Sequence, residues 1–168
     1  QACYFITFNT VDWVDVFTRP DYKDVIIESL DYCQKNKGLK VYAYVIMTNH
    51  VHLIAQAEGK IQLSDIARDF KKYTASTLLK MIVNNKKESR REWLLHRFQW
   101  NAKQLAGGRI YQFWQNDNHA IALYSPTVIW QKIDYVHSNP VAEGIVTSPE
   151  HYKYSSASDY AGNEGELK

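Results

Sequence analysis

Apolar residues recur along the chain in two alternating patterns. Short runs rich in aromatic and β-branched residues, which are typical of strands, alternate with longer stretches in which apolar residues recur every three or four positions, which is typical of helices. The strand pattern covers residues 2–9, 41–48, 51–57, 110–113 and 120–123. The helical pattern begins near Pro20, Ser64 and Ser125.

The expected helices have recognisable ends. Pro20 suits a first helical turn, and Gly38 suits the position just after a helix. Ser125 suits the N-cap of the last helix, which we expect to stop at Pro140. Only two residues separate the strands 41–48 and 51–57, so these strands pair antiparallel. The pattern predicts an α+β fold, in which helices pack on a mostly antiparallel sheet.

The length of 168 residues suits one compact domain, which we place at residues 1–160. Residues 84–110 are the hardest to assign, because they suit either a basic loop or a partly helical excursion. We expect residues 161–168 to be a disordered tail. The hydrophobic content of 45% and charged content of 23% are ordinary for a globular protein.

Several classes of protein are disfavoured by what the sequence lacks. No apolar run approaches the roughly 18 residues of a membrane span, and no signal-peptide pattern is seen, so we expect a cytoplasmic protein without a membrane partner. The two cysteines, Cys3 and Cys33, cannot form a disulfide framework or a cysteine-rich zinc site.

The net charge of +2 conceals a strong asymmetry. Residues 60–109 contain twelve basic and four acidic residues, a net +8, whereas the remainder contains eight basic and fourteen acidic residues, a net −6. Aromatic residues, including Trp93 and Trp100, lie within the basic part. Basic surfaces attract phosphates, and aromatic rings stack on unpaired bases. The segment therefore suits nucleic-acid binding, with a merely solvated helix face as the alternative.

Two histidines lie two positions apart in a predicted strand. The side chains of His50 and His52 should point to one face, with Cα atoms roughly 6.5–7 Å apart, so both imidazoles can meet one cation. Two histidines are too few for a structural zinc site, which needs four protein ligands. An open site that also takes water or a phosphate fits better. The alternative is that this pair binds no ligand.

A tyrosine and an asparagine are spaced one helical turn apart. Tyr135 and Asn139 share a helix face. A tyrosine hydroxyl is a weak nucleophile unless it is activated or its leaving group is stabilised, and a metal that holds a phosphate can do the latter. The alternative is that Tyr135 packs in the core and Asn139 ends the helix.

These motifs together resemble a known family. Residues 45–54 (VIMTNHVHLI) resemble the HUH motif of the IS200/IS605 single-tyrosine transposases, and residues 134–146 (DYVHSNPVAEGIV) resemble the tyrosine-bearing helix of the REP-associated tyrosine transposases. Further matches follow the family's order at 4–8 (YFITF), 113–115 (FWQ) and 154–157 (YSSA). Thr48 departs from the family, which usually has proline there.

The resemblance implies a ferredoxin-like fold, similar to an RNA-recognition module, and a specific chemistry. His50, His52 and Asn139 would bind Mg²⁺ or Mn²⁺, and Tyr135 would attack single-stranded hairpin DNA to give a 5′-phosphotyrosine and a free 3′-hydroxyl. Related transposases act as homodimers or as monomers, and both arrangements stay open here. We expect the basic segment to contact DNA through these side chains: Arg68, Lys71, Lys72, Arg90, Arg91 and Arg97.

Three other interpretations compete with this one. A replication-initiator or relaxase type of HUH nuclease shares the chemistry but lacks the Asn-Pro-Val turn after the tyrosine. A non-catalytic or domesticated module that binds single-stranded nucleic acid could use the same fold, but it would not need both histidines, Tyr135 and Asn139. A small metal-dependent hydrolase that uses water would not need Tyr135.

Overall fold

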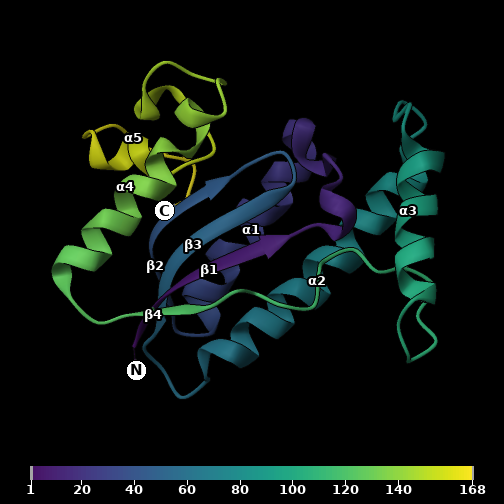
Figure 1. Cartoon of the computed structure of the whole chain (residues 1–168), viewed down its shortest axis with the longest axis horizontal. Coiled ribbons are helices and arrows are strands. Elements are labelled where there is room, and N and C mark those ends of the chain that lie inside the picture. Colours follow the sequence, from purple (N-terminus) through teal and green to yellow (C-terminus); the bar gives the residue numbers. More distant parts are fainter. Residues whose placement is uncertain (1, 168) are drawn as a thin grey trace.

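The computed structural model describes residues 2–167 and contains one antiparallel sheet. Its strand order is β2-β3-β1-β4, so β3 and β1 are central. The strands are β1 (Cys3–Asn9), β2 (Leu39–Ile46), β3 (His50–Ala57) and β4 (Ile121–Leu123). The α-helices are α1 (Pro20–Asn36), α2 (Leu63–Asn84), α3 (Arg91–Lys103), α4 (Pro126–Ala142) and α5 (Ala157–Tyr160). Figure 1 shows their arrangement.

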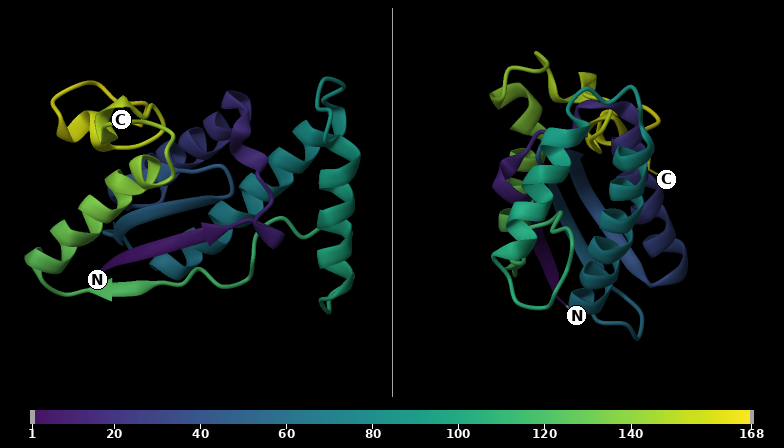
Figure 2. Two further views of the ribbon diagram at one scale, coloured as in Figure 1. Left: turned by 45° about the horizontal axis from the view of Figure 1, so that its top comes forward. Right: turned by 90° about the vertical axis from the view of Figure 1, so that its right-hand side faces the viewer.

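The chain order β1-α1-β2-β3-α2-β4, combined with this strand order, is the ferredoxin-like topology. The predicted α+β fold with an antiparallel sheet is therefore confirmed. Helix α3 is inserted between α2 and β4, and it stands at the end of the molecule away from α4 (Figures 1 and 2). Helix α4 follows β4 and lies against β2 and β3.

Strand β1 is covered on both faces. On one face, Phe8 packs on Phe70 of α2 with ring centroids 5.0 Å apart. On the other face, Phe5 meets Tyr135 of α4 with centroids 5.9 Å apart. A strand buried on both faces needs apolar residues at successive positions, which explains the run at 4–8. The sheet thus separates α2 from α4.

The helix ends agree with the sequence at most positions. Gly38 follows α1 with a φ of +74°, where glycine is favoured, and the Ser125 hydroxyl accepts from the Val128 N–H at the start of α4. The expected stop at Pro140 is wrong, because α4 continues to Ala142. The Glu143 N–H bonds to the Asn139 carbonyl, so the last turn closes despite the proline.

Residues 84–110 are partly helical, because α3 occupies thirteen of them. The turn before α3 is fixed by Glu88, which is 4% exposed and bonds to Arg19 and Arg90. The strand predicted at 110–113 is wrong. Instead Phe113 and Trp114 are both buried against Phe17, and one isolated bridge joins Trp114 to Thr10. Two successive buried aromatic residues do not suit the alternation of a half-buried strand.

The free edge of β2 is covered by the chain near its C-terminal end. Ile46 donates its N–H to the Tyr154 carbonyl, and Tyr44 donates its N–H to the Ser156 hydroxyl. Covering an edge strand prevents pairing with other chains. Beyond α5, the described chain reaches Leu167, whose side chain is 9% exposed and packs in the core; Lys168 lies outside the described residues. Within residues 2–167, no helix is long and apolar enough to cross a membrane.

Candidate active site

The histidine pair lies at the centre of the sheet, on the face covered by α4. His50 and His52 begin β3 and pair with Asn9 and Thr7 of β1, respectively. Their ring centroids are 4.6 Å apart, as expected for side chains on one strand face. His52 is 6% exposed and stacks on Phe5 with centroids 5.1 Å apart, so its ring cannot turn freely.

Both histidines are oriented through Nδ1. The Nδ1 atom of His50 lies 2.7 Å from Asn49 Oδ1, an oxygen that can only accept, so Nδ1 donates and leaves the Nε2 lone pair free. The Nδ1 atom of His52 lies 2.9 Å from the Thr7 hydroxyl. Such partners on the second ring nitrogen are characteristic of histidines that bind metals through the other nitrogen.

The protonation state of both rings favours metal binding. Burial, followed by the neighbouring His50 and Lys132, lowers the pKa of His52 to about 3. Burial also lowers the pKa of His50, an effect that the nearby Asn139 side chain and Glu143 partly oppose. Neutral imidazole is the form that coordinates a cation, so at neutral pH neither ring carries the extra proton that would compete with one.

Asn139 supplies an oxygen at the same place. Its Oδ1 atom is buried and has no partner in hydrogen-bonding geometry among the described residues. A buried polar atom without a partner is costly, and a cation would satisfy it. No three His, Cys, Asp or Glu side chains cluster anywhere in residues 2–167, so a third protein ligand at the histidine pair would have to be of another type, and the Asn139 amide oxygen is a candidate. Two nitrogens and one oxygen fit a divalent cation with open positions.

Tyr135 completes the group. It lies one turn before Asn139 on α4, its side chain is half exposed, and its ring centroid is 5.6 Å from that of His52. The structure therefore brings together the four residues predicted for catalysis and metal binding, all within one chain. A tyrosine hydroxyl, a set of metal ligands and an open side to solvent can support nucleophilic attack on a phosphate.

Lys132 is a site residue that sequence reasoning missed. Its Nζ atom lies 5.4 Å from the ring centroid of Tyr135 and 4.8 Å from that of Phe5. The only signal in the sequence is its position three residues before Tyr135, which places both on one helix face. Lys132 therefore places an ammonium group beside the rings of both Phe5 and Tyr135.

The loop beneath His50 is held by α3. The Asn49 Nδ2 atom donates to the Trp13 carbonyl at 3.3 Å. Asp12 and Trp13 have φ values of 53° and 48°, a conformation that non-glycine residues rarely adopt. The Asp12 carboxylate accepts from Arg97 and Asn101 of α3. A chain of contacts thus leads from α3 through this strained turn to the orientation of His50.

The six predicted DNA contacts lie outside the cluster of His50, His52, Tyr135 and Asn139, on or next to α2 and α3. Arg97 is held by Asp12, and the guanidinium of Arg90 bonds to Glu88, Thr18 and the Asp15 carbonyl. Arg91 donates to the Val83 carbonyl at 3.3 Å. All three lie at α3 or just before it, where their contacts serve the packing of that helix.

The other three lie on α2. Arg68 pairs with Asp65 and Asp69. The Lys71 ammonium donates to the Gln115 carbonyl at 2.6 Å and to Asn118 Oδ1 at 2.8 Å, and burial lowers its pKa to about 8. Lys72 is exposed and, unlike Arg68 and Lys71, has no bonding partner within the described chain.

Comparison with known proteins identifies the family and supports the fold. The family model described as "Transposase IS200 like" matches residues 2–103. A solved structure of a REP-associated tyrosine transposase bound to a REP hairpin superposes with a TM-score of 0.66 at 17% identity, covering 99% of this chain and 84% of that one. A putative transposase from Deinococcus radiodurans R1 gives a TM-score of 0.47 at 18% identity, covering 81% and 88%. No curated protein matches the chain. Because the family model covers more than half of its length, the chain belongs to the IS200-like transposases.

Proposed function

We propose that this protein is a metal-dependent transposase that cleaves and rejoins single-stranded DNA through a covalent link to Tyr135. The observation that carries the proposal is the convergence of Tyr135 with His50, His52 and Asn139 on one face of the sheet. A protein that only bound DNA would not need a half-exposed tyrosine beside two oriented histidines and a buried amide oxygen that has no partner. A hydrolase that used water would not need the tyrosine.

The three ligand residues would hold Mg²⁺ or Mn²⁺, which when bound polarises the scissile phosphate. The protein's own part is to orient the ligands. Asn49 and Thr7 fix the two imidazoles, and α4 holds Asn139 and Tyr135 at a spacing of one turn. Holding the nucleophile and the phosphate in place supplies much of the rate enhancement in such reactions.

In the proposed reaction, the Tyr135 oxygen attacks the phosphorus of a phosphodiester. The new bond joins tyrosine to the 5′-phosphate, and the bond between phosphorus and the 3′ oxygen breaks. The phenol loses its proton to solvent, and the departing 3′ oxygen takes up a proton to become a hydroxyl. The ammonium of Lys132 lies beside the Tyr135 ring and supplies positive charge where negative charge develops in the reaction. Attack by another 3′-hydroxyl reverses the step and joins strands.

The proposed substrate is single-stranded DNA that carries a hairpin. The support is the family match and the solved transposase of similar fold that is bound to a REP hairpin. We further propose that each chain cleaves with its own tyrosine, as a monomer would, because Tyr135 already lies beside His52 of the same chain. A homodimer that exchanges tyrosine helices is the alternative.

The test is covalent trapping. A hairpin oligonucleotide labelled at its 3′ end, the end that stays with the adduct, is incubated with the protein and Mn²⁺ or Mg²⁺, and the products are separated on a denaturing gel. We expect a protein–DNA adduct that is lost in Tyr135→Phe and in His50→Ala. Tyr124→Phe is the matched control, since Tyr124 is 87% exposed and lies outside the site. Cleavage that persists in Tyr135→Phe would disprove the role of that tyrosine, and binding without an adduct would favour a non-catalytic module.

A further inference from the structure

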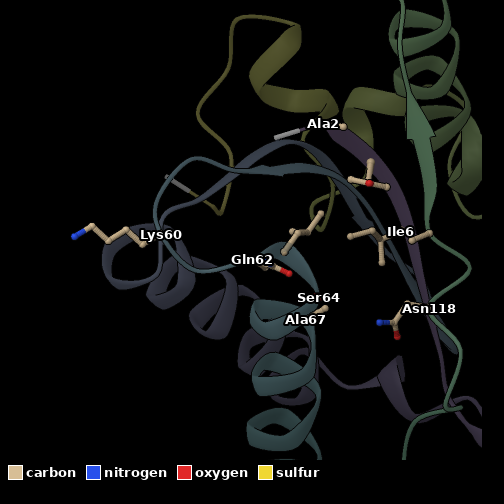
Figure 3. A pocket seen from close by; sticks show the side chains of 10 residues that line it. Ala2, Ile6, Lys60, Gln62, Ser64, Ala67 and Asn118 are labelled. Atoms are coloured by element: carbon tan, nitrogen blue, oxygen red, sulfur yellow. The ribbon is translucent and has the colours of Figure 1, made fainter.

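A groove follows α2 on the face of the sheet opposite Tyr135. Two adjoining cavities of about 610 and 690 Å³ form it, and Ser64 and Asn118 line both. Figure 3 shows the first, where Asn118 faces Ser64 and Ala67 of α2 across the cavity. We call the combined cavity, which lies between α2 and residues 109–120, the α2 groove.

The lining of the α2 groove contains more basic than acidic side chains. Lys72 is exposed and has no bonding partner within the described chain, and the guanidinium of Arg109 contacts only the neutral Gln112 side chain, at 3.3 Å. The acidic residue in its lining, Asp69, is already paired with Lys37 at 2.8 Å and with Arg68. Lys72 on α2 and Arg109 on the opposite wall are thus two cations without an acidic partner. Such a pair suits a chain of phosphates rather than a neutral ligand.

The lining also offers contacts for bases. Tyr111, which is partly buried, lines the groove between Arg109 and the core, and aromatic rings in such positions stack on unpaired bases of any sequence. The Lys71 ammonium fixes the amide of Asn118 through Oδ1. A groove with cations along it and a ring beside them matches a single strand better than a duplex, whose bases are covered.

The groove lies close to the catalytic group. The Asn118 carbonyl accepts from the Thr7 N–H at 2.9 Å, and the Thr7 hydroxyl contacts His52 at 2.9 Å. Only β1 therefore separates residue 118 from the histidine strand, a distance of roughly 10 Å between backbones. The edge of the sheet beside residue 118 is open to solvent, because Ile121 at the start of the edge strand β4 is 50% exposed. One DNA strand can lie in the groove and pass around this edge of the sheet to Tyr135.

We propose that the α2 groove binds an unpaired segment of the DNA substrate and leads it to the active site. Lys72 and Arg109 contact phosphates, and Tyr111 stacks on a base. This inference rests on the proposed function for the identity of the ligand, but the binding it describes needs neither metal nor cleavage. In this proposal Arg68 and Lys71, which are bonded to other residues of the chain, help to form the walls of the groove and do not contact phosphates directly.

The experiment measures the anisotropy of fluorescein-labelled oligothymidine without metal, in a Tyr135→Phe background and over a range of salt. The groove variant is Lys72→Ala with Arg109→Ala, and the control with the same change of charge is Lys35→Ala with Lys40→Ala on α1 and β2. The quantity compared is the slope of log affinity against log salt concentration. We expect its magnitude to fall by about 1.4 in the groove variant, about 0.7 for each lost phosphate contact, and to stay unchanged in the control. Tyr111→Leu should lose about tenfold in affinity at an unchanged slope.

Two outcomes would overturn the inference. One is an equal effect of the groove and control variants, including no effect of either. The other is that the groove variant weakens a blunt hairpin without unpaired ends as much as it weakens oligothymidine, which would mean that the groove holds duplex. The two proposals can fail separately. If the protein forms the adduct but the groove variant binds oligothymidine as well as its parent, only the groove proposal is wrong. If binding depends on the groove residues but no adduct forms, only the cleavage proposal is wrong.

Discussion

At the scale of single residues, the histidine pair is held in place by neutral side chains. His50 and His52 are oriented by an amide and a hydroxyl rather than by carboxylates. A carboxylate partner would raise the basicity of an imidazole ligand, and neutral partners do not. This environment suits a cation that is held loosely enough to accept a phosphate oxygen, as Mg²⁺ or Mn²⁺ would be.

Lys132 gives the first prediction at this scale. Lys132→Met should slow adduct formation about tenfold, which corresponds to about 1.4 kcal/mol of transition-state stabilisation, because the cation beside the phenol is lost. Lys132→Arg should keep most of the rate. The measurement is the rate of adduct formation at saturating DNA and metal.

The control is Lys153→Met, since Lys153 lies 5.5 Å from the ring of Tyr154 and away from the site. If Lys132→Met and Lys132→Arg slowed the reaction equally, packing and not charge would explain the effect.

Glu88 gives a prediction on stability. Burial alone would raise the pKa of this carboxyl, but hydrogen bonds from Arg90 and Arg19 outweigh it and lower the pKa to about 2. The folded pKa therefore lies below the unfolded value near 4.3, so the charged group stabilises the fold above that pH by roughly 3 kcal/mol and loses this contribution as pH falls towards 2.

Glu88→Gln should accordingly lower the free energy of unfolding at pH 7, measured by urea denaturation, and the difference from the wild type should narrow at pH 3. Glu92→Gln is the control, because Glu92 is exposed on α3. A difference that stayed constant between pH 7 and pH 3 would show that the charge of Glu88 does not stabilise the fold.

At the scale of elements, α3 supports the site from a distance. Its Arg97 and Asn101 hold Asp12 in a strained turn, and that turn accepts a hydrogen bond from Asn49, the partner of His50. The inserted helix thus supports the orientation of His50, one of the proposed metal ligands, without touching it. This contrasts with the expectation that its arginines contact DNA.

Arg97→Ala should weaken Mn²⁺ binding about fivefold, because the Asp12–Trp13 turn relaxes and His50 loses part of its orientation. Free Mn²⁺ can be followed by electron paramagnetic resonance, with Lys103→Ala on the same helix as control. Unchanged metal affinity together with weaker DNA binding would instead make Arg97 a DNA contact.

The elements also show what sequence can and cannot predict. The central strands, the helices α1, α2 and α4 and the sheet type follow from periodicity and from residues such as Gly38 and Ser125, because local chemistry decides them. The segment at 110–113 was misassigned because tertiary packing on Phe17 overrides its strand propensity. The candidate site was predictable from two local spacings and the family resemblance. The partners of Lys71 and Arg90 were not, because they come from distant parts of the chain.

At the scale of the whole molecule, the catalytic group and the α2 groove lie on opposite faces of one sheet and are separated by β1. The net charge of +8 in residues 60–109 is therefore not all available to a partner. Several cations of the basic segment, among them Lys71, Arg90 and Arg97, bind other parts of the chain. The exposed cations without such partners, such as Lys72, are the ones that we propose contact DNA.

The completeness of the site in one chain predicts how variants behave in mixtures. Tyr135→Phe mixed with His50→Ala should form no adduct, because neither chain contains an intact site. The same gel assay checks this over a range of protein concentration, with each variant mixed with wild type as control. Adduct formation by the mixture would show that the tyrosine helix serves the partner's histidines in a dimer.

The central claim is the covalent link at Tyr135, and mass spectrometry tests it most directly. The protein is incubated with hairpin DNA and Mn²⁺, digested with nuclease and trypsin, and its peptides are sequenced. We predict a nucleotide joined through its 5′-phosphate to Tyr135, with the other DNA fragment ending in a 3′-hydroxyl. A nucleotide on another tyrosine, or cleaved DNA with a free 5′-phosphate and no modified peptide, would contradict the account.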